Sequence, residues 1–272
     1  MIPIRDRLPR RSAPVVNYLI IAVNVLVFLW ERATIASGVS PRWLLAHFGL
    51  MPALLTEAPL RHLDSIFTSM FFHDPTGWAH IGGNMLFLWI FGDNVEDALG
   101  HARYLGFYLL SGLAAAALQI AIDPGSLVPM VGASGAIAGV LAAYGTLYPR
   151  SPITVLNPVL PLWFVFGLFI ELPAWVIILE FFLVNLLNAF GVLGATYGQA
   201  GGVAFFAHLG GFVAGLLLVR LFVRREVPRG YDRWNGWRPQ ARDERRRAAP
   251  GRSGDGAWSY PSQPRHRDPW GW

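Results

Sequence analysis

Six long apolar runs, separated by short polar or turn-forming segments, dominate the chain. They cover residues 15–30, 78–91, 104–122, 131–148, 173–190 and 202–223. Several are shorter than the roughly 20 residues that a bilayer core requires, so we expect these helices to borrow flanking residues or to lie in a locally thinned bilayer. The pattern predicts a membrane domain of six helices over residues 15–223.

A seventh apolar segment, residues 153–172, is interrupted by turn-forming residues. Pro158, Pro161 and Gly167 lie within it, and Pro173 follows it. Proline and glycine disfavour a continuous helix interior. We therefore expect an interfacial or re-entrant connector here, not a complete crossing.

Basic residues are concentrated at the two ends of the chain. All 22 are arginine, with four in residues 1–14 and thirteen in residues 220–272. Arginine-rich ends beside apolar helices favour the cytoplasmic side, and they fix topology more often than they bind nucleic acid. We expect both termini to be cytoplasmic and no nucleic-acid partner, and two cytoplasmic ends require an even number of crossings, which agrees with six.

Composition points to the same class of protein. Hydrophobic residues make up 54% of the 272 residues and charged residues only 14%, which predicts an all-α polytopic membrane protein. The chain has no cysteine, which excludes disulfides, thiolate chemistry and cysteine metal sites. Residues 1–14 are expected to form a basic tail, and residues 224–272, rich in Arg, Pro, Gly and Trp, to be disordered.

The first apolar run is expected to remain in the mature chain. It follows a basic start as a signal peptide would, but it has no small-residue cleavage site. The expected location is the cell membrane, as a multi-pass protein.

Four polar side chains lie near the starts of the second, fourth and sixth predicted helices: His80, Asn84, Ser134 and His208. If the N-terminus is inside, these three helices all run from the outer face inward. At a rise of about 1.5 Å per residue, Ser134 and His208 each lie about 7 to 9 Å below the outer helix ends. A site near the non-cytoplasmic face is therefore expected.

Local spacing shows which of these side chains could meet. His80 and Asn84 are four residues apart and project from the same helix face. Small residues form a stripe on the fourth and on the sixth helix, and such stripes allow two helices to pack closely; they include Gly135, Gly139, Gly211 and Gly215. Close packing would bring His208 within hydrogen-bond reach of Ser134, the arrangement that activates a serine.

The order H-x-x-x-N, then G-A-S-G, then A-H-x-G-G-x-x-x-G, each in an apolar helix, resembles the rhomboid family of intramembrane serine proteases, of bacterial type, over residues 67–220. The resemblance implies a six-helix rhomboid bundle in which Ser134 is the nucleophile and His208 the general base. It also implies an oxyanion hole formed by His80, Asn84 and the backbone N–H of Ser134, with Gly132 as a further candidate. Each oxyanion donor is worth about 3 to 4 kcal/mol by analogy. Neither a cofactor nor a metal ion is expected.

The other polar residues are expected to have structural roles. No carboxylate lies at a spacing that would orient His208, so a Ser–His dyad is expected and the orienting contact is left open. Hydrogen bonds between helices, without a part in the reaction, are expected for Asn17, Asn24, Gln119, Glu180 and Asn185. Solvated loop positions are expected for His47, His62 and His73.

Transmembrane protein substrates and the lipid bilayer are the expected partners, and the oligomeric state is left open. The alternative is a catalytically inactive rhomboid-like module that binds membrane clients, although such a module would be expected to lose Ser134 or His208. A solute transporter would predict internal repeats and a site near the midplane, and neither is apparent.

Overall fold

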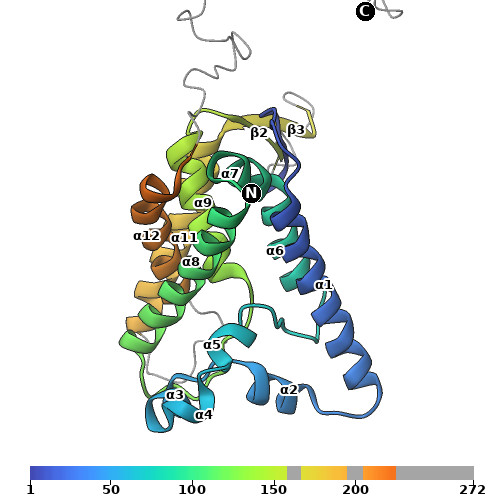
Figure 1. Cartoon of the computed structure of the whole chain (residues 1–272), viewed down its shortest axis with the longest axis vertical. Helices are drawn as coiled ribbons and strands as arrows, with labels where there is room; N and C mark the ends of the chain where they lie inside the picture. Colours follow the sequence, from blue (N-terminus) through green and yellow to red (C-terminus); the bar gives the residue numbers. More distant parts are fainter. Residues whose placement is uncertain (158–166, 195–204, 225–272) are drawn as a thin grey trace, which may run out of the picture. The chain divides into compact units, whose positions relative to one another are not determined.

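The computed structural model describes residues 1–157, 167–194 and 205–224, and it is mostly helical (Figure 1). A helix lies in each of the six predicted apolar runs. The corresponding helices are α1 (Val15–Ala36), α6 (Ala79–Phe87), α8 (His101–Ile122), α9 (Ser134–Leu147), α11 (Ala174–Gly194) and α12 (Phe205–Phe222).

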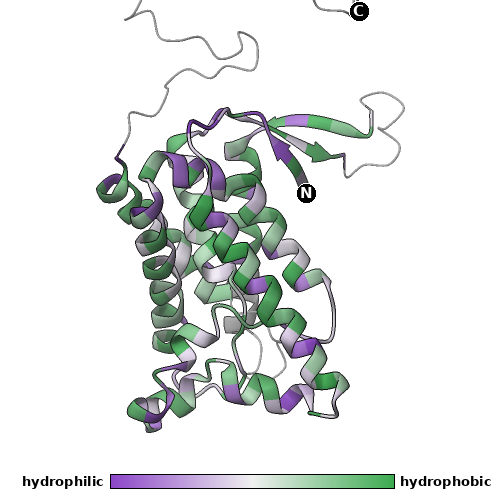
Figure 2. Ribbon diagram, turned by 45° about the vertical axis from the view of Figure 1, so that its right-hand side comes forward, coloured by the Kyte–Doolittle hydropathy of each residue, from purple (hydrophilic) through white to green (hydrophobic). Residues whose placement is uncertain are grey.

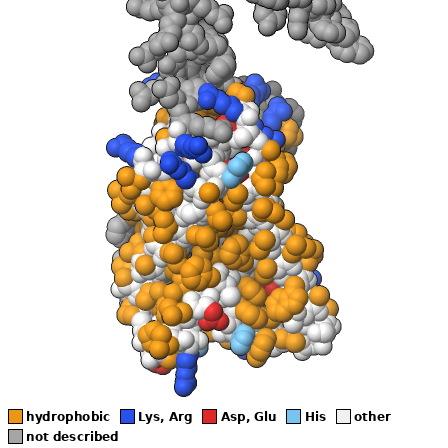
Figure 3. Space-filling view, in the orientation of Figure 1, with side chains coloured by type: hydrophobic (Ala, Val, Ile, Leu, Met, Phe, Trp, Pro, Cys, Tyr) orange, Lys and Arg blue, Asp and Glu red, His pale blue; other side chains and the backbone are white. Residues whose placement is uncertain are grey.

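Three of these helices, α1, α8 and α12, are long and apolar enough to cross a membrane. Within the described residues, α9 and the Ala174–Leu187 part of α11 are shorter apolar helices. Figure 2 shows hydrophobic residues along the helices, and Figure 3 shows hydrophobic side chains over most of one face, with arginines gathered near the end that carries the sheet. Leu26 and Leu217 are 65% and 69% exposed, as expected for side chains that face lipid.

The second apolar run contains an irregular turn. After α6, the π-helical turn η1 (Leu88–Gly92) leads into α7 (Asp93–Leu99). The carbonyl of Leu88 accepts a hydrogen bond from Asn17 Nδ2 on α1 at 2.9 Å, and Tyr104 of α8 donates its hydroxyl to Asn17 Oδ1 at 2.8 Å. Asn17 thus joins α1 to two other elements, which is the interhelical role expected for it.

A three-stranded antiparallel sheet, in the order β1-β2-β3, lies at one end of the bundle (Figure 1). Its strands are β1 (Ile2–Asp6), β2 (Pro152–Leu156) and β3 (Phe169–Pro173), with Thr154 opposite Glu171. The expectation of an all-α chain is therefore wrong here, because β1 lies in the expected tail and β2 and β3 lie in the expected connector. β-Branched residues favour extended backbone, and prolines are tolerated at strand ends, where Pro152 and Pro173 pair.

Residues 158–166 of that connector lie outside the described residues, as do residues 225–272 of the expected C-terminal tail.

Four short helices connect α1 to α6 at the opposite end from the sheet (Figure 1). They are α2 (Pro41–Phe48), α3 (Pro52–Glu57), α4 (Pro59–His62) and α5 (Ser65–Thr68). Proline begins the first three of them, where its missing N–H has no helical partner to lose.

The core lies where α12 packs against α8 and α9. Every residue of α9 from Gly135 to Tyr144 is buried, so this helix is enclosed by the others. The largest buried side chains on α8 are Tyr104, Phe107 and Tyr108. The helix that begins at Ser134 therefore packs directly against both α8 and α12.

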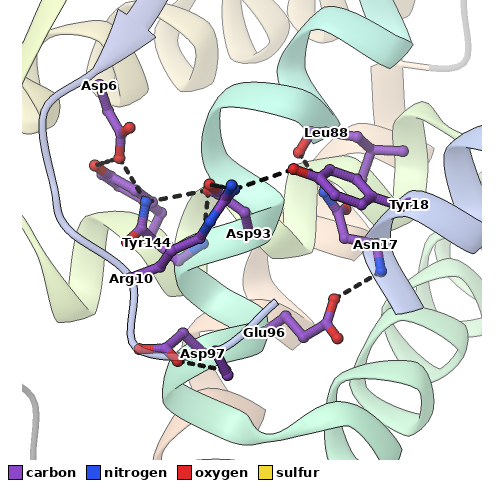
Figure 4. A network of polar contacts seen from close by, with 11 residues as sticks. Asp6, Arg10, Asn17, Tyr18, Leu88, Asp93, Glu96, Asp97 and Tyr144 are labelled. Carbon is purple, nitrogen blue, oxygen red and sulfur yellow. Dashed lines mark hydrogen bonds and ion pairs between the residues drawn. The ribbon is translucent and has the colours of Figure 1, made fainter. Parts of the chain in front are cut away.

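Glu96 on α7 caps the start of α1. Its carboxylate accepts the backbone N–H groups of Val16 and Asn17 at 3.0 and 2.7 Å. Figure 4 shows Glu96 facing Asn17. The N-cap residue Pro14 makes no side-chain cap. Carboxylates stabilise helix N-termini, both through hydrogen bonds and through the helix dipole. The end of α1 is thereby tied to α7.

The N-terminal segment is bound to the bundle by polar contacts (Figure 4). Asp6 Oδ2 accepts hydrogen bonds from Tyr144 Oη at 2.8 Å and Asn94 Nδ2 at 2.7 Å, and Arg10 pairs with Asp93 at 3.0 Å. Burial, helped by the charge of Asp93, raises the pKa of Asp6 to about 7. Residues expected to form a tail therefore pack against α7 and α9.

Candidate active site

Ser134 and His208 meet at the starts of two helices. Ser134 is the first residue of α9, and His208 is in the first turn of α12. The Oγ of Ser134 and the Nε2 of His208 are 2.7 Å apart, a normal hydrogen-bond distance. Both residues are partly exposed.

Glycines allow the approach of α9 and α12. A Cβ atom on Gly211 would lie 2.9 Å from the carbonyl carbon of Gly135, and one on Gly215 would lie 2.6 Å from the Cα of Gly139. Both distances are shorter than real Cβ contacts, so the two backbones touch. The Ser134–His208 distance depends on this contact, because each partner lies within one turn of it.

Gly132 makes room for two side chains from α6. It has a φ of +122°, in the region that favours glycine, and a Cβ there would lie 2.8 Å from His80 Nε2 and 3.5 Å from Asn84 Nδ2. Its own N–H donates to the Ser69 carbonyl at 2.8 Å. The structure therefore brings His80 and Asn84 to the backbone two residues before Ser134, while the N–H of Gly132, a candidate oxyanion donor, is already engaged.

Ser134 offers its own backbone N–H to this region. The first residues of a helix have no intrahelical acceptor for their N–H groups, and the helix N-terminus carries a partial positive charge. Since α9 begins at Ser134, a backbone N–H without an intrahelical acceptor and the positive helix end lie beside its side chain. The arrangement favours a negative charge at this point.

His73 makes a hydrogen bond to the side chain of Asn84. Asn84 Nδ2 lies 2.9 Å from His73 Nε2, and His73 Nδ1 lies 3.2 Å from the Phe71 carbonyl. A carbonyl only accepts, so Nδ1 carries the proton and Nε2 accepts from Asn84. The expectation that His73 is a solvated loop residue is wrong, since it is fully buried; the apolar residues directly before it were the signal for burial.

Neutral His73 suits this acceptor role. Burial, together with the neighbouring His80, lowers the pKa of His73 to about 4, so the ring is uncharged at neutral pH. Glu31 on α1 accepts the backbone N–H of His73 at 3.0 Å, and Arg32 donates to the Pro75 carbonyl at 2.8 Å. The far end of α1 therefore anchors the loop that orients Asn84.

His80 has one ring nitrogen turned away from Gly132. The backbone N–H of Asp74 donates to His80 Nδ1 at 3.5 Å, which is a weak hydrogen bond. In the neutral ring, this leaves the proton on Nε2, the nitrogen that faces Gly132. His80 and Asn84 thus both direct N–H groups toward the stretch before Ser134. Among the described residues, no group of three or more His, Asp or Glu side chains comes together as a metal site.

The second ring nitrogen of His208 has a partner on α11. Its Nδ1 lies 2.5 Å from Asn185 Oδ1, while Asn185 Nδ2 donates to the Phe181 carbonyl at 2.8 Å. Sequence reasoning assigned Asn185 a hydrogen bond between helices, and it makes one. It did not show that the partner would be His208, because the contact depends on how α11 packs against α12.

The chain is similar to known proteins of one family. Residues 60–225 match the Rhomboid domain family. The chain is 30% identical to Rhomboid protein 1, mitochondrial, of Saccharomyces cerevisiae, over 74% of this chain and 51% of that protein. It is 32% identical to human presenilin-associated rhomboid-like protein, mitochondrial, over 50% of this chain and 34% of that protein, and 30% identical to RHOMBOID-like protein 1 of Arabidopsis thaliana, over 61% and 38%.

The aligned region is thus about half the length of the yeast protein and about a third of the other two. The family match covers more than half of this chain and contains the histidine and asparagine of α6, the serine of α9 and the histidine of α12. Together with the apolar helices that are long enough to cross a bilayer, it identifies the chain as a multi-pass membrane protein of the rhomboid family.

Proposed function

We propose that the protein is an intramembrane serine endopeptidase that cleaves peptide bonds in or near transmembrane segments of other membrane proteins. The observation that carries this proposal is the 2.7 Å contact between Ser134 Oγ and His208 Nε2. A serine whose hydroxyl meets a histidine nitrogen has the partner that a nucleophile needs. Its place in a rhomboid domain supports the same reading.

In the proposed reaction, Ser134 Oγ attacks the substrate carbonyl carbon while its proton passes to His208 Nε2. The C–N bond of the tetrahedral intermediate then breaks, and His208 returns the proton to the leaving amine. Water attacks the acyl-enzyme in the second half, and His208 again accepts and returns a proton. The first half leaves Ser134 acylated and His208 neutral. In the second half the proton returns to Ser134 Oγ as the carboxylic acid leaves, which restores the starting state of the pair.

The proposed oxyanion hole consists of His80 Nε2, Asn84 Nδ2 and the backbone N–H of Ser134. Gly132 leaves the space that allows the two α6 side chains to approach. The role of His73 is to turn the Asn84 amide so that its nitrogen faces the site. Donors fixed before the reaction are most effective where little water is present to solvate the developing charge.

For the topology, we propose six crossings with both termini in the cytoplasm and a membrane domain over residues 15–223. The sheet end would then lie on the cytoplasmic side, where the arginines gather (Figure 3). The starts of α9 and α12 would lie toward the opposite face. Substrates would be transmembrane helices that unwind easily near that face, because a scissile bond must be extended before it reaches Ser134.

We propose a cell membrane as the location. The yeast and human relatives carry the word mitochondrial in their names. Fractionation of cells that express the tagged chain separates these two locations.

The proposed function is tested by cleavage of a transmembrane substrate in liposomes. Ser134→Ala is expected to abolish cleavage while the protein stays folded, because the residue is partly exposed and the loss of one hydroxyl removes little packing. Ser111→Ala is the matched control: this serine of α8 is buried, and its Oγ has no hydrogen-bond partner in the described part of the chain. Retained cleavage in Ser134→Ala would refute the nucleophile assignment.

A further inference from the structure

Asn185 lies between a backbone carbonyl and the ring of His208. It is 7% exposed, and it reaches the carbonyl of Phe181, one turn earlier on α11, with Nδ2 at 2.8 Å. Its Oδ1 lies 2.5 Å from His208 Nδ1. The Phe181 ring also packs near the imidazole, with ring centroids 5.9 Å apart, so α11 presents two side chains to His208.

Only one assignment of hydrogen-bond donors and acceptors fits this chain of contacts. A carbonyl oxygen only accepts hydrogen bonds, so the Asn185 amide nitrogen must face Phe181. The amide oxygen then faces His208 Nδ1, and that nitrogen must carry the proton. The other nitrogen, Nε2, is left with a lone pair directed at Ser134 Oγ.

We propose that Asn185 is a positioning residue that fixes the tautomer and orientation of His208. This inference rests on the proposed function, since it assigns Asn185 the task of keeping Nε2 ready to accept the serine proton. The backbone carbonyl of Phe181 sets the amide, the amide sets Nδ1–H, and Nδ1–H leaves Nε2 as the base. The chain of contacts thus contains an orienting third residue, which the expected dyad lacked.

The same contact strengthens as the reaction proceeds. When the proton of Ser134 Oγ moves to His208 Nε2, the ring becomes positive and the bond from Nδ1–H to Asn185 Oδ1 becomes charge-assisted. A neutral amide supplies this without a carboxylate, whose charge is costly within an apolar membrane domain. Asn185 therefore orients the base without a second buried charge.

The test uses the full-length protein, labelled with ¹⁵N at histidine, in detergent micelles. The nitrogen signals of His208 are assigned by their loss in His208→Ala, and they report which ring nitrogen carries the proton. The parent is expected to be protonated at Nδ1. In Asn185→Leu this preference is expected to disappear, and the rate of substrate cleavage is expected to fall about ten- to a hundredfold.

Two variants separate orientation from packing. Asn185→Asp keeps an oxygen acceptor for Nδ1–H in either protonation state, so it is expected to restore the tautomer and most of the activity. Asn24→Leu is the matched control, since Asn24 is also a buried asparagine whose Nδ2 bonds the carbonyl four residues earlier, on α1. It is expected to leave the His208 signals and the cleavage rate unchanged.

The outcomes are distinguishable. A parent protonated at Nε2, or an Asn185→Leu variant with the parent's tautomer and rate, would overturn the assignment of Asn185. If Asn185→Leu does not fold, the protonation state of the His208 ring in the parent protein still tests the assignment. A parent that shows Nδ1–H but cleaves no substrate would contradict the proposed function, while the tautomer would still support the contact with Asn185.

Discussion

A methyl group at Gly211 would test how closely α9 and α12 must pack for the Ser134–His208 pair to form. The added Cβ would overlap the carbonyl oxygen of Gly135 and would lie 2.9 Å from its carbonyl carbon, whereas ordinary contacts begin at 3.4 Å. The obstacle is backbone, which cannot turn away as a side chain can. The two helices would have to separate by more than about 1 Å, and overpacking of this kind costs about 1 to 3 kcal/mol or more.

That separation acts directly on the reactive pair. Gly211 is three residues from His208, and Gly135 follows Ser134 in sequence, so the 2.7 Å contact would lengthen with the helices. A misplacement of about 1 Å can cost about a hundredfold in rate. We therefore expect Gly211→Ala to fold with a lowered melting temperature and to cleave a transmembrane substrate about ten- to a hundredfold more slowly.

The matched control is Gly106→Ala on α8. Its Cβ would meet only the Phe222 ring, at an ordinary contact distance of 3.5 Å, and alanine favours a helix more than glycine does. This variant is expected to keep the parent rate and stability. If Gly211→Ala matched the parent in both melting temperature and cleavage, the close packing of α9 and α12 would not be needed for the site.

Three further predictions concern the Ser134–His208 pair, the proposed oxyanion hole and the N-terminal segment. His208→Ala should be as damaging as Ser134→Ala, and the double variant should cost little more, because the two act as a unit; additive losses in kcat would contradict this coupling. Asn84→Ala should lower kcat by about a hundredfold, less than loss of the serine, since other oxyanion donors remain; a parent-like kcat would remove it from the site. The pKa of Asp6 is raised to about 7, above its ordinary value of 3.8. Its contribution to the free energy of unfolding is therefore fully present below pH 4 and is lost as the pH rises through 7. Thermal unfolding should therefore occur at a lower temperature at pH 8 than at pH 5, and a difference of the same size in Asp6→Asn would exclude Asp6 as its source.

Local spacing was sufficient to anticipate part of this site. The interval of four residues between His80 and Asn84 sets them on one helix face whatever the rest of the chain does. Glycine has no side chain whatever its surroundings, so the sequence alone indicated that α9 and α12 could approach closely. These features depend on few distant residues, and the structure brings His208 to Ser134 where the glycines meet.

Contacts set by tertiary packing could not be read in the same way. β1 pairs with β2 across about 150 residues, and a short arginine-containing segment gives little local sign of it. The burial of His73 depends on α1, whose Glu31 holds the loop. The partner of Asn185 depends on the side of α11 that faces α12. Each required knowledge of which elements become neighbours.

Covalent labelling of the parent protein shows whether Ser134 is an activated nucleophile. A fluorophosphonate reacts with an activated serine, forming an Oγ–P bond and releasing fluoride, and peptide mapping by mass spectrometry locates the adduct. We expect a single adduct on Ser134, and we expect it to be absent in His208→Ala. An adduct on a different residue, or undiminished labelling in Ser134→Ala, would contradict it.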